Sequence, residues 1–417
     1  MAKIVIDGGY KLNGVVSISG SKNAALPCIA ATLLTSQPCI LENVPEISDV
    51  EVMFGIIQSI GGKVERLAKN KYKIQTQKIS SSSLPRDLVR KLRASILFLG
   101  PLLAKKGQVK MAHPGGCILG KRPIGTHFEA LEALGVKFQQ NRLFYTGRVK
   151  RLKGAKMFLD EVSVTATENA LMAASLASGK TIIKPAACEP SVINLAQMLK
   201  KMGAKIKNEG THTIEVEGVT TLSGCQHKIN ADEIETGTWA IAAAITKGQI
   251  TIKNAPLENL DAILYKLGQI GVRYKIENSN LLILPSNNLK ASRIQIDTWP
   301  RLPTDLQPQL TVLVTQAGGD SLIHDWLYEK RLLYTQELVK MGAQIILFDP
   351  HRALVHGPTQ LSGREIKSPD LRAGMAYILA GLCAQGQTIV GKVENIERGY
   401  EEIEEKLQKL GAKIKRV

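Results

Sequence analysis

Aromatic residues are scarce in this chain of 417 residues, in which Phe, Trp and Tyr together make up 5%. Aliphatic side chains must therefore build the hydrophobic cores, and the row of stacking aromatics that binds single-stranded nucleic acid is missing. Long apolar runs are also missing, because none reaches the length of about 18 residues that a membrane span needs. Residues 1–8 read as a short strand and not as the apolar core of a signal peptide. We therefore expect a cytoplasmic protein.

Paired cysteines are lacking as well. No two of the six cysteines stand in a C-x-x-C pair, and no Cys/His cluster has the spacing of a zinc site. This pattern predicts no metal site and fits a reducing compartment. Apolar neighbours mark Cys28, Cys39 and Cys383 as inert core thiols.

Acidic residues are too few to balance the basic ones, since 37 Asp and Glu face 54 Lys and Arg, for a net charge of +17. Such an excess predicts an anionic partner, which is nucleic acid, an anionic surface or a phosphorylated small molecule. The positive residues are spread along the chain and do not form an arm or tail. A basic surface with an anion-binding cleft fits this distribution better than a non-enzymatic nucleic-acid-binding protein, which stays the alternative.

An internal repeat is the most informative feature that the chain does contain. An apolar residue, a glycine and a small residue recur about every 70 residues, each time after apolar residues at helical spacing. A glycine is suited to end a helix because it tolerates the left-handed conformation. The glycines of this pattern are Gly61, Gly135, Gly203, Gly271, Gly342 and Gly411.

A second pattern marks strands. Alternating apolar residues follow Gly107, Gly179, Gly248 and Gly386, each time before a helical stretch. Together the two patterns predict six units of strand, loop, helix, glycine and strand. At this length we expect two domains of three units. The predicted domains are residues 20–229, and residues 1–19 with 230–417, so that the N-terminal strand pairs with the second half.

Two loops carry candidate chemistry in the first half. Residues 19–27 place Lys22 among small residues at the start of an apolar helix, where backbone N–H groups and the lysine charge favour an anion. A capped helix with a solvent-facing lysine is the alternative. Residues 113–123 place Cys117 in a glycine-rich turn with Lys121 and Arg122 close behind. Nearby cations favour a reactive thiolate, although a cysteine buried in a tight turn has the same pattern.

Further candidates lie in the second half. Asp305 follows a proline and precedes an apolar helical run, so it either caps that helix or acts as a base. Arginines also stand at the starts of predicted elements, and arginine suits bidentate binding of carboxylate and phosphate. Singly, each arginine is most often a surface residue. They are Arg93, Arg331, Arg372 and Arg398.

In order along the chain, five of these segments resemble the enolpyruvyl transferase family, and within it the UDP-N-acetylglucosamine 1-carboxyvinyltransferases. The segments are Ser21-Lys22-Asn23, the Gly116-Cys117 loop with Arg122, Pro303-Thr304-Asp305, Asp370-Leu371-Arg372 and Arg398-Gly399-Tyr400. The resemblance runs over the whole chain. It implies an α/β fold, a two-domain inside-out α/β barrel with six βαβαββ-like repeats, three per domain, and an active site in the cleft between the domains.

The resemblance also implies a reaction, in which phosphoenolpyruvate adds to the 3′-hydroxyl of UDP-N-acetylglucosamine and phosphate is then eliminated, without a metal or cofactor. It implies Cys117 as the acid at the methylene carbon and as the target of fosfomycin, Asp305 as the base, and Asp370 in the proton-transfer network. Glu189 matches a position near the active site. The residues expected to bind phosphoenolpyruvate are Lys22, Arg93, Arg122, Arg331 and Arg398. Those expected to bind the sugar nucleotide are Asn23, Arg93, Arg122, Pro123, Ile124, His127, Ser163, Val164, Thr165, Asp305 and Leu327.

The chain departs from the family pattern on the nucleotide side. Gly125 and Thr126 stand where the family commonly has aspartate and a leucine-like residue, and Thr165 stands where it has glycine. Glu161 would repel a diphosphate, and Ser191 replaces a frequent acidic residue. Another sugar nucleotide or shikimate 3-phosphate therefore remains an alternative acceptor, although the reactive cysteine argues against shikimate 3-phosphate.

Overall fold

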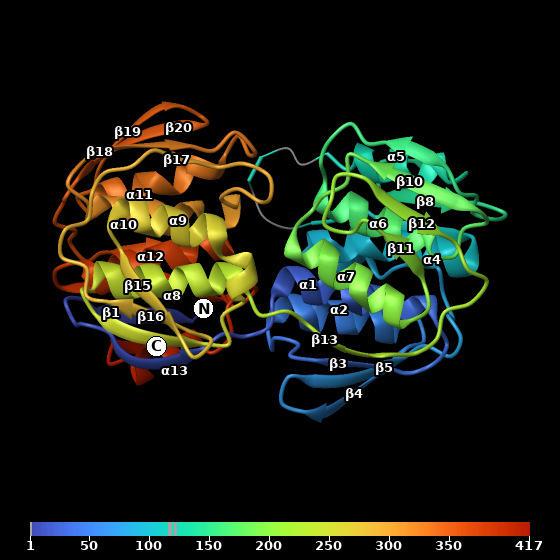
Figure 1. Cartoon of the computed structure of the whole chain (residues 1–417), viewed down its shortest axis with the longest axis horizontal. Coiled ribbons are helices and arrows are strands. Elements are labelled where there is room, and N and C mark those ends of the chain that lie inside the picture. Colours follow the sequence, from blue (N-terminus) through green and yellow to red (C-terminus); the bar gives the residue numbers. More distant parts are fainter. Residues whose placement is uncertain (1, 116–118, 121–122) are drawn as a thin grey trace. The chain divides into compact units, whose positions relative to one another are not determined.

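The structure is a computed structural model that describes residues 2–115, 119–120 and 123–417 (Figure 1). Cys117 and Arg122 lie outside the described residues. The chain divides into two compact units. Unit 1 consists of Met1–Ser19, Ala231–Val417 and the segment Cys117–Arg122, of which Leu119 and Gly120 are described; unit 2 consists of Gly20–Gly116 and Pro123–Asn230.

Unit 2 contains three sheets around a core of aliphatic side chains. Their strand orders are β13-β3-β5-β4, β6-β8-β7 and β11-β12-β10-β9. The strands are β3 (Cys39–Glu42), β4 (Lys63–Ala68), β5 (Lys71–Gln75), β6 (Gln108–Ala112), β7 (Lys137–Gln140), β8 (Phe144–Arg148), β9 (Lys156–Phe158), β10 (Lys180–Lys184), β11 (Lys205–Lys207), β12 (Ile214–Glu217) and β13 (Gln226–Lys228). The helices are α1 (Lys22–Ala31), η1 (Thr32–Leu34), α2 (Ser48–Ser59), α3 (Arg86–Lys91), η2 (Arg93–Phe98), α4 (Leu99–Lys106), α5 (Gly125–Ala133), α6 (Val164–Ala174) and α7 (Pro190–Lys201).

Unit 1 repeats this plan with the strand orders β21-β22-β1-β23, β15-β16-β14-β2 and β17-β18-β20-β19. The strands are β1 (Lys3–Asp7), β2 (Asn13–Ser17), β14 (Gln249–Lys253), β15 (Arg273–Glu277), β16 (Asn280–Leu284), β17 (Ile294–Gln295), β18 (Gly319–His324), β19 (Gln344–Asp349), β20 (Arg352–Gly357), β21 (Glu365–Lys367), β22 (Gln387–Gly391) and β23 (Lys413–Arg416). The helices are α8 (Glu233–Ile245), η3 (Leu257–Asn259), α9 (Asp261–Ile270), η4 (Thr304–Leu306), α10 (Gln307–Thr315), η5 (Arg331–Tyr334), α11 (Thr335–Lys340), α12 (Leu371–Cys383), η6 (Val393–Asn395) and α13 (Ile403–Lys409).

The same pairing scheme recurs from sheet to sheet. In the sheet of β9 to β12, β9 and β10 are parallel, whereas β12 is antiparallel to both β10 and β11. The sheet of β17 to β20 has the same scheme. In the three-stranded sheet, an isolated parallel bridge between Ser83 and Lys110 takes the place of the parallel strand. The six repeats that the glycine pattern predicts are therefore present as strand–helix units.

The six repeating glycines all have positive φ, between 90° for Gly411 and 104° for Gly203 and Gly342. Each follows the end of an outer helix or its capping residue, as the sequence pattern predicted. At Gly271 a side chain would also be obstructed, since an added Cβ would lie 2.7 Å from the backbone oxygen of Asn288. Only glycine combines this backbone conformation with this close approach at no steric cost.

The N-terminal strand β1 completes the last sheet of unit 1. It pairs antiparallel with β22 on one side and with β23 on the other. Figure 1 shows it in blue among the red elements of the C-terminal repeat. The predicted pairing of this strand with the second half is confirmed.

Each unit is built around buried helices. In unit 1, α8, α10 and α12 lie against one another, and nearly every residue in them is buried. In unit 2, α1 and α6 are buried over most of their length and contact η2, which continues into α4. The outer helices, such as α7 and α9, bury only one face. The ends of the inner helices are therefore the places where polar residues reach the edge of each core.

Candidate active site

The predicted site residues of unit 2 stand at the starts of its inner helices. Lys22 is the first residue of α1, Arg93 is the first residue of η2, and Ser163 caps α6, where its Oγ accepts from the N–H of Ala166 at 3.4 Å. Since the first N–H groups of a helix have no partner within the helix, these positions favour anionic ligands. The period of about 70 residues thus places candidate residues at the same point of each repeat.

Lys22 is held by a carboxylate that the sequence did not reveal. Its Nζ lies 3.7 Å from Oδ2 of Asp49 on α2, and the two side chains are 12% and 4% exposed. Asn23, the next residue on α1, is half-buried. Nothing near Asp49 in the sequence marks it as a site residue, because its role depends on the packing of α2 against α1. A buried counter-ion orients the lysine.

Arg93 reaches the segment that leads into α5. Its Nη2 donates to the backbone oxygen of Pro123 at 3.0 Å. Pro123 is exposed and Ile124, which precedes the first residue of α5, is half-buried. These three residues, all predicted to bind substrate, are therefore brought together by the structure.

His127 and Thr165 join the first turns of α5 and α6. The imidazole Nε2 lies 3.0 Å from Oγ1 of Thr165, and Nδ1 lies 2.9 Å from Nδ2 of Asn169. His127 is buried, whereas Ser163, Val164 and Thr165 at the start of α6 are half-buried. The predicted ligand His127 thus contacts Thr165 and Asn169 within the protein, and the residues of α6 form the more accessible surface.

A buried carboxyl group that sequence reasoning missed lies nearby on α6. Ser191 Oγ donates to Oε1 of Glu168 at 3.1 Å. Burial raises the pKa of Glu168 well above its ordinary value, and the neighbouring Glu189 raises it further, while the hydrogen bond from Ser191 lowers it. Ser191 is the departure noted in the sequence, and here it solvates a carboxyl group that an acidic residue would repel.

In unit 1, Asp305 is held between two buried arginines. Arg372 Nε and Nη2 lie 3.1 Å and 2.9 Å from Oδ2, and Arg331 Nη2 lies 3.2 Å from Oδ1. The arginine side chains are 1–2% exposed, against 30% for Asp305. Arg331 Nη2 also donates to the backbone oxygen of Thr304 at 2.6 Å. This arrangement favours the ionised carboxylate and fixes its direction.

The arginines of this clamp remain charged. Burial lowers the pKa of Arg331, but the carboxylates of Asp305, Asp370 and Asp325 outweigh it and raise the pKa above its ordinary value. The pKa of Arg372 is raised in the same way, with Asp305 as the largest raising cause. Arg331 was predicted to bind phosphoenolpyruvate, and that assignment stays a prediction. In the structure its guanidinium is directed at Thr304 and Asp305.

Asp370 and Leu327 lie around the clamp. Asp370 caps α12, where its Oδ1 accepts from the N–H groups of Arg372 at 2.9 Å and Ala373 at 3.1 Å. The N–H of half-buried Leu327 donates to Oδ1 of Asp325 at 3.1 Å, and Thr304 Oγ1 donates to Oδ2 of the same residue at 2.6 Å. Asp370 therefore acts on Arg372 through the helix start.

Asp232 and Glu233 at the start of α8 belong to the same cluster, although sequence reasoning passed over them. Asp232 Oδ1 accepts from the N–H groups of Ile234 at 2.8 Å and Glu235 at 2.9 Å. Burial and the charge of Asp232 raise the pKa of Glu233 to about 8, although Arg372 opposes the shift. The repeat could have revealed both residues, because they occupy the helix start that Asp305 and Asp370 occupy in the next two repeats.

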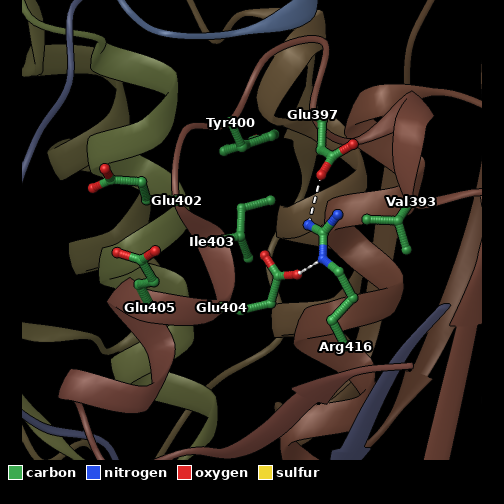
Figure 2. Close-up of a pocket in the computed structure, with 8 residues that line it drawn as sticks. All are labelled: Val393, Glu397, Tyr400, Glu402, Ile403, Glu404, Glu405 and Arg416. Carbon is green, nitrogen blue, oxygen red and sulfur yellow. Dashed lines mark hydrogen bonds and ion pairs between the residues drawn. The ribbon is translucent and has the colours of Figure 1, made fainter. Parts of the chain in front are cut away.

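The last strand, β23, anchors the loop that contains Arg398. Arg416 on β23 forms ion pairs of 2.5 Å with Glu397 and Glu404. Figure 2 shows its guanidinium between these carboxylates, at a cavity of about 330 Å³. Tyr400, two residues after Arg398, lies with its ring 5.2 Å from the guanidinium carbon of Arg372. The half-buried Arg398 is thus flanked by two anchored residues.

The thiols of the described cysteines are poor nucleophiles with one exception. Burial raises the pKa of Cys28 well above its ordinary value and raises those of Cys188 and Cys383 to about 11 and 12. Cys39 differs from the expectation of a purely apolar neighbourhood, because a hydrogen bond with the Cys225 thiol lowers its pKa. That pairing arises where β3 and β13 run side by side, and the local sequence does not reveal it. Cys39 is nevertheless fully buried.

Metal ligands do not gather in the described part of the chain. Among residues 2–115, 119–120 and 123–417, no three His, Cys, Asp or Glu side chains are placed to hold a metal ion. Among the helices formed by those residues, none has the length and apolar character needed to cross a membrane.

Comparisons with known proteins show which family the chain belongs to. A family model described as EPSP synthase (3-phosphoshikimate 1-carboxyvinyltransferase) matches residues 6–407. The chain therefore belongs to this family of enolpyruvyl transferases, as the ordered motifs predicted.

The names of individual relatives are more specific than the description of the family model. UDP-N-acetylglucosamine 1-carboxyvinyltransferase of Treponema denticola is 44% identical over 422 residues, which cover 99% of both chains. The protein of the same name from Halothermothrix orenii is 43% identical over 100% of both chains.

Solved structures show the same fold. The enolpyruvyl transferase NikO from Streptomyces tendae superimposes with a TM-score of 0.90 at 23% identity, covering 100% of this chain and 99% of its own. EPSP synthase from Acinetobacter baumannii gives a TM-score of 0.78 at 19% identity, with 100% of both chains covered. The predicted α/β enolpyruvyl transferase fold is confirmed.

Proposed function

We propose that the protein transfers the enolpyruvyl group of phosphoenolpyruvate to the 3′-hydroxyl of UDP-N-acetylglucosamine and releases phosphate. This reaction is the first committed step of peptidoglycan synthesis. The observation that supports the proposal most directly is the 44% identity, over 99% of the chain, to the UDP-N-acetylglucosamine 1-carboxyvinyltransferase of Treponema denticola. No cofactor enters the proposed chemistry, because phosphoenolpyruvate brings both the double bond and the leaving group.

The reaction consists of an addition and an elimination. In the addition, the acceptor hydroxyl loses its proton and bonds to C2 of phosphoenolpyruvate, while the methylene carbon C3 takes up a proton. The product is a tetrahedral ketal. In the elimination, C3 loses a proton, the bond from C2 to the phosphate oxygen breaks, and the enolpyruvyl ether remains. The protein must therefore supply an acid at C3, a base at the hydroxyl, and cations for the phosphate and carboxylate groups.

The cations come from several elements. We assign Lys22, Arg122 and Arg398 to phosphoenolpyruvate, with Arg93 and Arg331 in support. Asp49 beside Lys22 and the ion pairs around Arg398 support this assignment, because an oriented cation binds an anion in fixed geometry. Cys117 is proposed as the acid at C3 because the resemblance to the family implies that role, and the cations of Lys121 and Arg122 that follow it in the sequence favour a reactive thiolate.

Asp305 is the proposed base for the acceptor hydroxyl. The clamp of Arg372 and Arg331 keeps it ionised and directed, and it also weakens it as a base. Proton transfer therefore accompanies the attack on C2, when the hydroxyl proton is most acidic. Arg331 and Asp370 are positioning residues in this scheme, since their contacts lead to Asp305 directly and through Arg372.

Phosphate release from phosphoenolpyruvate tests the proposal. We expect release that requires UDP-N-acetylglucosamine, that collapses in Cys117→Ser, and that persists in the control Cys383→Ser, whose thiol donates to its own helix at Ala380. Release with shikimate 3-phosphate but not with the sugar nucleotide would favour the acceptor that the family description names. No release with either, together with salt-sensitive binding of nucleic acid, would overturn an enzymatic function.

We also propose that the protein acts in the cytoplasm. Both proposed substrates carry phosphate charges, which a bilayer excludes, so the enzyme must work where they are made. Fractionation that recovers the protein outside the cytoplasmic fraction would contradict this proposal.

A further inference from the structure

The amide of Asn169 on α6 is fixed by two backbone groups. The N–H of Gly100 donates to Asn169 Oδ1 at 2.8 Å, and Asn169 Nδ2 donates to the backbone oxygen of Ile96 at 3.0 Å. A backbone N–H only donates and a carbonyl oxygen only accepts. The positions of the amide oxygen and nitrogen are therefore determined by chemistry, because the reverse orientation would oppose like groups at both contacts.

The fixed amide determines the tautomer of His127. The second N–H of Asn169 Nδ2 points at Nδ1 of His127, 2.9 Å away, so Nδ1 must accept and carries no proton. A neutral imidazole then has its proton on Nε2. That proton is donated to Oγ1 of Thr165, 3.0 Å away.

The tautomer in turn directs the hydroxyl of Thr165. Since Oγ1 accepts from His127, its own proton turns away from the imidazole. Thr165 is half-buried in the first turn of α6, whereas His127 and Asn169 are buried. Through Asn169 and His127, two backbone groups in the core therefore determine the direction of the hydroxyl proton of Thr165 at an accessible helix start.

We propose that Thr165 is a specificity-determining residue that donates a hydrogen bond to the nucleotide sugar, and that Asn169 and His127 are the positioning residues that keep it a donor. The inference rests on the proposed function, because it assigns Thr165 to the acceptor of that reaction. With the opposite tautomer, Nε2 would accept the hydroxyl proton and Thr165 would lose it as a donor. Thr165 is one of the departures on the nucleotide side, so this donor belongs to the present chain.

Steady-state kinetics test the hydroxyl group. Thr165→Val removes the donor and keeps the shape, and we expect it to raise KM for UDP-N-acetylglucosamine about tenfold, with kcat and KM for phosphoenolpyruvate changed less than about twofold. Thr165→Ser restores the donor and should restore KM. The matched control is Thr181→Val on β10 of the same unit, since the buried Oγ1 of Thr181 has no partner among the described residues.

The tautomer is tested separately by NMR on the full chain with ¹⁵N-labelled histidine. We expect the ring of His127 to carry its proton on Nε2. The signals of His127 are assigned as those that disappear from the spectrum of His127→Gln. Asn169→Asp places a carboxylate next to Nδ1 of His127. The imidazole proton then moves to Nδ1, and Nε2 accepts a hydrogen bond from the hydroxyl of Thr165 in place of donating one. Its acceptor KM should rise as in Thr165→Val, and the double variant should show no further rise.

The outcomes separate the inference from the function on which it rests. Turnover by the wild-type protein with an unchanged acceptor KM in Thr165→Val would overturn the inference alone, as would a proton on Nδ1 of His127. If Asn169→Asp does not fold, the wild-type tautomer and the Thr165 pair decide the matter. Calorimetry that finds no binding of UDP-N-acetylglucosamine to the wild-type protein, with no turnover, would overturn the function and the inference together.

Discussion

The guanidinium of Arg372 holds the carboxylate of Asp305 with two nitrogens, Nε at 3.1 Å and Nη2 at 2.9 Å from Oδ2. Removing this buried cation leaves Asp305 and Asp232 without their shared counter-charge, so we expect Arg372→Leu to destabilise the protein by about 3 kcal/mol. Arg372→Lys keeps the charge but not the fork, and should cost less. Urea unfolding measures both variants. An Arg372→Leu protein as stable as the wild type would show that the clamp contributes nothing net.

Stability should fall as the pH rises through the range in which Glu233 titrates. Burial, followed by the charge of Asp232, raises its pKa to about 8, whereas an unfolded glutamate titrates near 4.3. Between these two pKa values the folded state binds one proton more than the unfolded state. The contribution of Glu233 to the free energy of unfolding is therefore full at low pH, and it is lost at up to about 1.4 kcal/mol per pH unit as the pH rises. Glu233→Gln should remove this slope in urea unfolding between pH 5 and pH 9. Parallel pH profiles for variant and wild type would exclude Glu233 as the cause.

Two helical glycines should respond in opposite ways to alanine. A Cβ at Gly100 would lie 2.6 Å from the backbone oxygen of Asn169, so Gly100→Ala should destabilise the protein by about 1–3 kcal/mol. At Gly268 in α9 the nearest atom is a ring carbon of Tyr274 at 3.8 Å, and Gly268→Ala should stabilise by about 0.5–1 kcal/mol. Thermal unfolding of both variants checks the pair. A change of the same sign in both would contradict the packing described at Gly100.

Arg416 should affect substrate binding more than stability. Arg416→Ala releases Glu397 and Glu404 from ion pairs that are partly exposed, which costs about 1 kcal/mol or less. The loop with Arg398 loses its anchor, so we expect KM for phosphoenolpyruvate to rise about threefold to tenfold. Lys415→Ala, an exposed neighbour on β23, is the control for charge alone. Equal KM values for the two variants would assign any change to net charge and not to the loop.

Fosfomycin should alkylate Cys117 selectively. The described thiols are buried or have raised pKa values, such as about 11 for Cys188 and about 12 for Cys383, and the thiol is not the reactive form. We expect one added mass on the Cys117 peptide and loss of turnover. Cys117→Ser should take up none. Full activity after long exposure, or labelling at Cys225, would refute the proposed reactivity.

The sequence predicted the repeating framework better than the contacts within the site. The glycines that end the outer helices and the strands that follow Gly107 or Gly386 are local patterns, so the repeats could be counted without a structure. The positions of Asp305 and Asp370 at the starts of inner helices could be predicted for the same reason, and their roles stay predictions. Asp49 and Asn169 were not, because their partners come from distant segments that only packing brings together.

The place of β1 between β22 and β23 has a consequence for the order of synthesis. Unit 2 is one stretch of chain apart from residues 117–122, so its sheets have all their strands once Asn230 leaves the ribosome. The strand Lys3–Asp7 must instead wait for partners that are made last. Its edges stay unpaired while nearly the whole chain is translated, and an unpaired apolar strand is a hazard for aggregation. Translation speed and chaperone supply should therefore limit the yield of unit 1 more than that of unit 2.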